Sequence, residues 1–105
     1  AYHGDDKAAS YIEQRFHSGL HRLLHERQVA AVQGVLDRIG PGAALEIAPG
    51  PGRVTRDVRP AGSLTCLEYN AGMLAHGQAA CPPSVRWVQG NAFELPFTTP
   101  FDFVY

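Results

Sequence analysis

The sequence is poor in the features that mark membrane, secreted or nucleic-acid-binding proteins. No run of apolar residues is long enough to span a membrane, and no signal peptide is visible. Nine basic and ten acidic residues give a formal net charge of −1 without a basic cluster, which argues against nucleic acid as a partner. Cys66 and Cys81 lack the spacing of a metal or redox motif, so we expect reduced thiols in a cytoplasmic protein.

A length of 105 residues allows one small domain, residues 1–105, with amino-terminal helices over residues 1–40 and strands and helices over residues 41–105. In the first part, apolar residues recur at three- and four-residue spacing, which is typical of helices. We expect two helices there, broken near Ser18 and Gly19. The second helix ends where a Gly-Pro-Gly sequence prevents its continuation.

Three histidines, His17, His21 and His25, share one helical face with Glu13. Metal sites need three or four ligands that converge with suitable geometry. We therefore interpret these residues as a polar surface stripe and predict no metal site.

Residues 43–55 read A-A-L-E-I-A-P-G-P-G-R-V-T, a short apolar run followed by alternating proline and glycine. Aliphatic residues flank Glu46 in the pattern of a strand, whereas residues 49–52 can continue neither a strand nor a helix. We expect a strand, a tight turn and a helix that restarts at Arg53. Glycine lets the backbone approach a ligand, and the first amides of a helix offer free donors, so this unit is typical of nucleotide-like cofactor sites.

Two classes of cofactor use such a loop. The dinucleotide fingerprint G-x-G-x-x-G is broken by Thr55, which stands where the third glycine should be and disfavours a nicotinamide cofactor. The loop instead resembles the first motif of Rossmann-like S-adenosylmethionine-dependent methyltransferases, an acidic residue followed by G-x-G-x-G. Residues 46–52 match it except at Ala48, which replaces the first glycine and costs little if its φ is negative.

This resemblance implies that the loop binds the cofactor S-adenosyl-L-methionine through Glu46, Ala48, Gly50 and Gly52. Glu46 would hold the methionine end, and the two glycines would supply backbone contacts. Alternatively, Glu46 is a capping carboxylate that orders the loop without touching the ligand.

A second motif follows the predicted second strand, residues 63–67. Glu68 closes that strand sixteen residues after Gly52, close to the distance at which Rossmann-like folds place an acidic residue for the ribose hydroxyls. Residues 68–74, E-Y-N-A-G-M-L, resemble the family's second motif, which implies that Tyr69 and Met73 pack against adenine. The alternative for Glu68 is an exposed carboxylate at a strand end.

A third motif follows the predicted third strand, residues 85–88. Residues 90–97, G-N-A-F-E-L-P-F, resemble the family's G-D-A and L-P-F sequences, with Asn91 in place of aspartate. Asparagine keeps an acceptor for the exocyclic amine of adenine. The resemblance implies that the Ala92 N–H faces the ring, and Phe93 either covers adenine or is a surface aromatic.

Residues 101–105, F-D-F-V-Y, look like the family's F-D-x-V entry into a fourth strand, so the resemblance covers residues 29–105. It implies an α/β, Rossmann-like fold, with a parallel sheet in spatial order 3-2-1-4 truncated after about four strands and helices on both faces. In the family the fold continues with segments that shape the acceptor site.

The implied function is that of the S-adenosylmethionine-binding portion of a methyltransferase with an unidentified acceptor and no catalytic base that can be named. The alternatives are a catalytically inert fragment, excised or engineered, that self-associates, and a nicotinamide-dinucleotide-binding domain. Because the acceptor segments are absent and the sequence begins with Ala1, we expect a processed, tagged or excised chain without activity of its own. Only Asp102 discourages pairing at the aromatic outer edge of the fourth strand, so we expect a homodimer through that edge.

Overall fold

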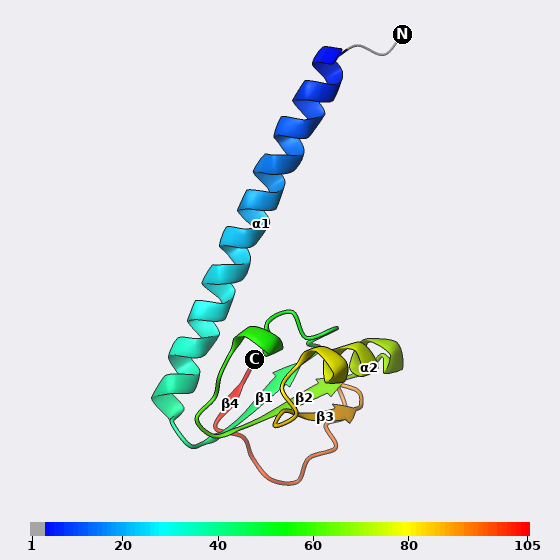
Figure 1. Cartoon of the computed structure of the whole chain (residues 1–105). Coiled ribbons are helices and arrows are strands. Elements are labelled where there is room, and N and C mark those ends of the chain that lie inside the picture. Colours follow the sequence, from blue (N-terminus) through cyan, green and yellow to red (C-terminus); the bar gives the residue numbers. More distant parts are fainter. Residues whose placement is uncertain (1–3) are drawn as a thin grey trace.

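The computed structural model describes the backbone of residues 4–105 and the side chains of residues 17–105. A long helix stands on a small α/β body that contains a four-stranded sheet (Figure 1). The projecting helix makes the molecule elongated, with dimensions of 62 × 30 × 25 Å. The helical elements are α1 (Gly4–Ile39), α2 (Ala71–Ala80) and the short 3-10 helix η1 (Thr55–Asp57).

The four strands are parallel and lie in the order β3-β2-β1-β4, which confirms the predicted Rossmann-like arrangement. β4 is shorter than predicted, but backbone bonds from Asp102 and Tyr105 to β1 continue the contact on both sides of it. The strands are Ala43–Ile47 (β1), Ser63–Glu68 (β2), Arg86–Gln89 (β3) and Phe103–Val104 (β4).

The predicted break near Ser18 and Gly19 is wrong, because α1 runs through both residues without interruption. A single glycine costs a helix only about 1 kcal/mol and leaves the backbone hydrogen bonds intact. The predicted end of the helix is confirmed: Gly40 has a φ of 58° and donates its N–H to Leu36 O at 3.2 Å. No helix in the described part of the chain has both the length and the apolarity to cross a membrane.

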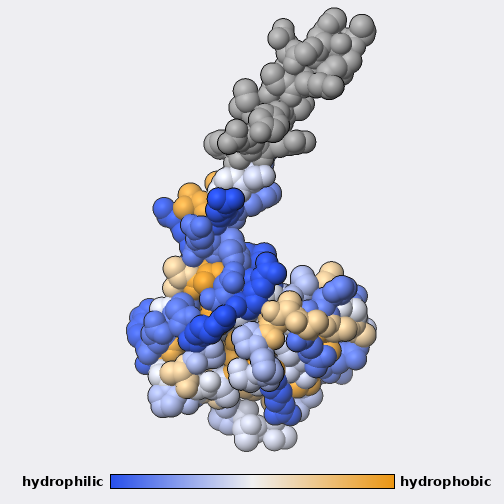
Figure 2. All heavy atoms as spheres, in the orientation of Figure 1, coloured by the Kyte–Doolittle hydropathy of each residue, from blue (hydrophilic) through white to orange (hydrophobic). Residues whose placement is uncertain are grey.

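Between the grey residues and the body, α1 carries exposed apolar side chains (Figure 2). Leu20, Leu23 and Leu24 have exposed fractions of 38%, 45% and 50%. Leu36, by contrast, is fully buried where the helix reaches the sheet. Among residues 17–39 of α1, the core therefore contains side chains from Val29 onward.

The described helices pack against one face of the sheet. Leu36 of α1 belongs to the same core cluster as Leu64 of β2. Gly77 of α2 lies against the ring of Trp87, and Trp87 is the register partner of Cys66. Because side chains two residues apart share a face of a strand, Leu64, Cys66 and Trp87 point to the same side, and so both helices cover that side.

The opposite face, which we predicted would also carry helices, is covered in the described residues by an extended connection. Leu67 is 2% exposed there, and it contacts Gly90 at the start of this connection near Pro96. Residues 90–102 contain no helix, and their two prolines cannot donate the hydrogen bonds of one. The predicted helices therefore lie on one face only.

The predicted helix from Arg53 to Val58 is also wrong. The chain forms turns after the glycines and then the 3-10 turn η1, with Asp57 N donating to Val54 O at 3.0 Å. Thr55 and Val58 are both buried, and so this short connection is tied to the core at two points before Pro60 ends it. Between the turns that follow the glycines and Pro60, the chain forms this 3-10 turn in place of an α-helix.

Candidate functional site

All nine residues predicted to bind the cofactor lie at or beyond the carboxyl-terminal halves of the first three strands. Parallel strands place these ends along one edge of the sheet, which is where open α/β sheets bind ligands. Each motif thus follows a different strand at that edge. The residues are Glu46, Ala48, Gly50 and Gly52 after β1, Glu68, Tyr69 and Met73 after β2, and Asn91 and Ala92 after β3.

The glycine loop, residues 48–52, has a positive φ at three alternating positions. Ala48, Gly50 and Gly52 have φ angles of 53°, 61° and 87°. The negative φ under which alanine would cost little is therefore not found at Ala48: its N–H still continues the sheet by donating to Leu67 O at 2.9 Å, and the chain turns immediately afterwards. The left-handed region costs a residue with a Cβ roughly 1–2 kcal/mol, so Ala48 is strained where the family motif has glycine.

The two glycines have different surroundings. A Cβ at Gly50 would meet no atom within 4 Å, whereas a Cβ at Gly52 would lie 2.6 Å from Cys81 Sγ. Gly52 is therefore required for the packing of the loop against the end of α2. Gly50 faces open space, which leaves its backbone accessible to a ligand.

Glu46 is a buried carboxylate on β1, with an exposed fraction of 6%. Its Oε1 accepts hydrogen bonds from Thr55 Oγ1 at 2.7 Å and from the Tyr105 hydroxyl at 3.1 Å. Burial raises the pKa of Glu46 above its ordinary value, while these two bonds and the charge of Arg53 oppose the rise. Burial and the nearby Glu46 charge in turn raise the pKa of Tyr105.

Sequence reasoning missed the roles of Thr55 and Tyr105. Thr55 was identified only as the residue that breaks the dinucleotide fingerprint, yet it is fully buried and fixes the Glu46 carboxylate. Beside it, Cys66 and Cys81 are free and buried, and burial raises the pKa of Cys66 to about 12, so this thiol stays protonated at neutral pH. The cysteines are structural, as expected.

A hollow of 300 Å³ separates α1 from the glycine loop. Glu46 and Arg53 supply a carboxylate and a guanidinium to it, and the other lining residues are mainly apolar. The full lining is Gln28, Ala31, Val32, Glu46, Arg53, Val54 and Tyr105.

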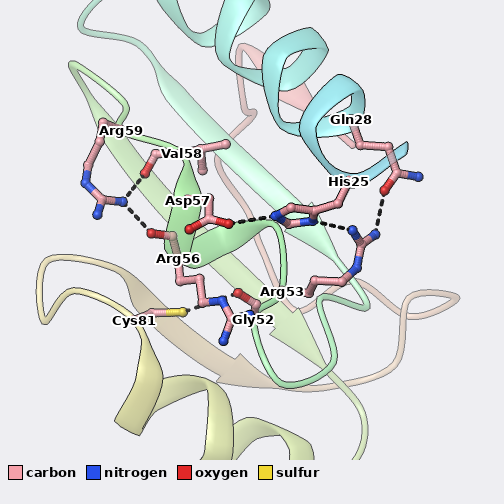
Figure 3. Close-up of polar contacts among 9 residues, drawn as sticks. All are labelled: His25, Gln28, Gly52, Arg53, Arg56, Asp57, Val58, Arg59 and Cys81. Carbon is pink, nitrogen blue, oxygen red and sulfur yellow. Dashed lines mark hydrogen bonds and ion pairs between the residues drawn. The ribbon is translucent and has the colours of Figure 1, made fainter. Parts of the chain in front are cut away.

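The loop is tied to α1 by a chain of polar contacts (Figure 3). His25 Nε2 lies 2.7 Å from Asp57 Oδ2, and Arg53 Nη1 lies 2.6 Å from His25 Nδ1. A guanidinium only donates, so Nδ1 must accept and the Nε2–H must donate to Asp57. Arg53 Nη2 also donates to Gln28 Oε1 at 2.6 Å.

These contacts revise the interpretation of the histidine stripe. His25 is half-buried and joins α1 to the loop, whereas His17 and His21 are exposed, with ring centroids 6.5 Å apart. Side chains of residues 17–105 form no group of three that could bind a metal ion. The contacts of His25 span about thirty residues of sequence, and no local pattern could have indicated them.

Glu68 is buried, with an exposed fraction of 7%, which contradicts the alternative that it is an exposed strand-end carboxylate. Its Oε1 accepts the Gly50 N–H at 2.8 Å, and its Oε2 accepts the Asn70 N–H at 2.8 Å. Glu68 therefore joins the glycine loop to the turn before α2. A carboxylate has about four acceptor sites, so both oxygens retain capacity for a ligand.

The second and third motifs meet beside Glu68. Tyr69 and Met73 are 74% and 44% exposed, and Gln89 Nε2 donates to Tyr69 O at 3.2 Å. Asn91 Oδ1, the acceptor expected for adenine, accepts the Phe93 N–H at 2.9 Å and keeps one lone pair. Ala92 is exposed, as is Phe93.

A family model described as a methyltransferase domain matches residues 44–105. This match contains all three motifs and the four strands of the sheet apart from the first residue of β1. No curated protein sequence matches the chain.

Solved structures share its fold. A Galdieria sulphuraria protein, crystallised as a candidate sarcosine dimethylglycine methyltransferase, is 16% identical with a TM-score of 0.62, over 78% of this chain and 34% of that one. The glycopeptide N-methyltransferase MtfA is 27% identical with a TM-score of 0.56, over 72% and 37% of the two chains. The complex of MtfA with sinefungin is 26% identical with a TM-score of 0.55, over 74% of this chain and 33% of that one.

The chain thus spans about a third of the length of these structures. The match of the family model covers more than half of it and agrees with the motifs, the strand order and the fold. The chain therefore belongs to the methyltransferase domain family.

Proposed function

We propose that this chain forms the S-adenosyl-L-methionine-binding portion of a methyltransferase, which transfers the methyl group to an unidentified acceptor. The family supports this cofactor, as does the sinefungin complex of a structural neighbour. The main observation behind the proposal is that three motifs meet at the carboxyl ends of β1, β2 and β3. There, the Gly50 N–H donates a hydrogen bond to the buried Glu68 carboxylate, and the space beside Gly50 is open.

The adenosine end of the cofactor fits beside Glu68. Its carboxylate retains acceptor sites for ribose hydroxyls, although both oxygens already bind backbone amides. The exposed side chains of Tyr69 and Met73 would contact adenine, with Asn91 and the Ala92 N–H as its polar partners. Four residues of this set lie on exposed turns or on the first turns of α2, so a ligand can reach them without unfolding the sheet.

The methionine end fits beside Glu46. Its carboxylate lines the hollow under α1 and would accept from the ammonium group, while Gly50 and Gly52 contribute backbone. When bound, the cofactor would supply an electrophilic methyl carbon on its sulfonium, open to in-line attack by an acceptor nucleophile with the thioether as the leaving group. The residues of this chain would contribute chiefly by binding and alignment.

Calorimetric titration with S-adenosylhomocysteine and with NAD tests the proposal. We expect binding of the first compound only, since buried Thr55 occupies the place of the third dinucleotide glycine. Binding of NAD alone would favour the nicotinamide alternative, and binding of neither would favour an inert fragment. Trp87, the one tryptophan of the sequence, lies beside Gly77 and near Gly52, so its fluorescence gives a second readout of the loop.

The homodimer through β4 also remains a proposal. β4 is an edge of the described sheet, and Val104 is 50% exposed. Phe103 is half-buried and stacks on Tyr105 with ring centroids 4.9 Å apart, so Val104 is the better site for a disrupting charge. Sedimentation equilibrium should show a dimer that Val104→Lys dissociates, whereas Gln89→Lys on the other edge leaves it intact. A monomeric wild-type protein would refute the proposal.

A further inference from the structure

The hollow between α1 and the glycine loop contains two opposite charges on largely apolar walls. Glu46 and Arg53 both line it, and they interact electrostatically. Ala31, Val32 and Val54 supply much of the remaining surface. Such a site suits a short zwitterion whose ammonium and carboxylate groups lie close together, with an apolar chain attached.

Arg53 is held in place but is not neutralised by its direct partners (Figure 3). Within residues 17–105, its hydrogen bonds go to His25 Nδ1 and to Gln28 Oε1, and both of these acceptors are uncharged. The Asp57 carboxylate lies on the far side of the His25 ring, bound to Nε2. A guanidinium has five N–H donors, so three remain for an anion.

From this arrangement we infer that Arg53 is a specificity-determining residue that binds the carboxylate of the ligand's amino-acid end. The inference rests on the proposed function, which assigns the ammonium of the methionine end to Glu46. The next charge in the same hollow is then the Arg53 guanidinium, whose planar fork matches a carboxylate in two parallel hydrogen bonds.

His25 and Gln28 of α1 act as positioning residues for Arg53. They are three residues apart and therefore neighbours on the helix surface, where they bind Nη1 and Nη2 separately. Asp57 orients the His25 ring from its other nitrogen, so that Nδ1 is an acceptor. The carboxyl-terminal half of α1 thereby becomes part of the cofactor site, although the family match begins only after it, at residue 44.

The test compares S-adenosylmethionine with its decarboxylated form, which keeps the sulfonium and the ammonium. In calorimetric titrations, the wild-type protein should bind S-adenosylmethionine roughly tenfold or more tightly than the decarboxylated compound, the scale of hydrogen bonds between charged groups. Arg53→Met should remove most of this preference by weakening only the binding of the carboxylate-bearing compound. Arg56→Met, which removes a neighbouring exposed guanidinium, is the matched control and should leave the preference unchanged.

A second pair of variants tests whether α1 positions the Arg53 side chain or only packs against the body of the protein. Gln28→Met removes the acceptor of Arg53 Nη2 and should reduce the preference severalfold. Gln33→Met removes a different contact of α1, the bonds of Gln33 to the backbone of Arg59, and should not change it. If both variants reduce the preference equally, α1 contributes only by packing against the body of the protein, and the proposed role of Gln28 in positioning Arg53 is wrong.

The outcomes are distinguishable. Equal loss of affinity for both compounds in Arg53→Met, or a wild-type protein that does not discriminate between them, would overturn the carboxylate assignment while leaving the cofactor proposal in place. Failure of the wild-type protein to bind either compound would overturn the proposed function and this inference with it.

Discussion

Replacing Ala48 by glycine should stabilise the protein. Ala48 has a φ of 53°, in the left-handed region where a Cβ costs about 1–2 kcal/mol. Glycine removes that cost but increases the entropy of the unfolded chain, which is worth about 0.4–1 kcal/mol in the opposite direction. Because Ala48 is exposed, its methyl group contributes little burial. The net expectation is a gain of about 0.5–1 kcal/mol in the free energy of unfolding.

For a domain of this size, the gain corresponds to a rise in Tm of roughly 2–8 °C. Thermal unfolding followed by circular dichroism measures it, with urea titration as a check at constant temperature. Ala61→Gly is the matched control, since Ala61 is also exposed but its φ is not positive, and there glycine should destabilise by about 0.4–1 kcal/mol. If Ala48→Gly lowers Tm as much as the control does, the strain argument is wrong.

Other variants separate binding from stability. Glu68→Ala should weaken S-adenosylhomocysteine binding by about 1.5–3 kcal/mol and also lower Tm, because the Gly50 and Asn70 amides lose their acceptor; unchanged affinity would contradict the ribose assignment. Gly50→Val should abolish binding, whereas Gly52→Ala should chiefly reduce Tm through its clash with Cys81. The raised folded-state pKa of Glu46 means that the wild-type protein loses stability as pH rises from about its unfolded value of 4.5 through that pKa. Glu46→Gln should flatten this part of the stability profile measured by urea unfolding between pH 4 and 8.

Local patterns in the sequence were sufficient to predict the sheet and the motifs. Strand alternation around Glu46, the glycine loop and the acidic residue that closes β2 are all contained in short segments. These patterns predicted the strands, and the resemblance added the strand order and the cofactor. Two features that these patterns did not determine, the sign of φ at Ala48 and the short η1, depend on how the turn fits between buried strands.

The remaining features depend on contacts between distant residues. Nothing near His25 in the sequence indicates that its two ring nitrogens would bind Asp57 and Arg53. Similarly, Glu46 and Tyr105 are 59 residues apart, and their bond exists only because β4 pairs with β1. The continuity of α1 through Gly19 was missed because propensity is a weak guide when the penalty is only about 1 kcal/mol.

The surroundings of Glu46 bear on the choice between a structural and a cofactor-binding role for this residue. Burying a carboxylate is costly unless its oxygens accept hydrogen bonds. The bond from the Thr55 hydroxyl ties the carboxylate to the connection after the glycines, whereas the bond from the Tyr105 hydroxyl ties it to the residue after β4, so ordering of the loop accounts for one of the two bonds. These hydroxyls stabilise its charge on one oxygen, while the residue still lines the hollow that contains Arg53. A carboxylate that lines this hollow beside a guanidinium is the arrangement that a ligand-binding role predicts.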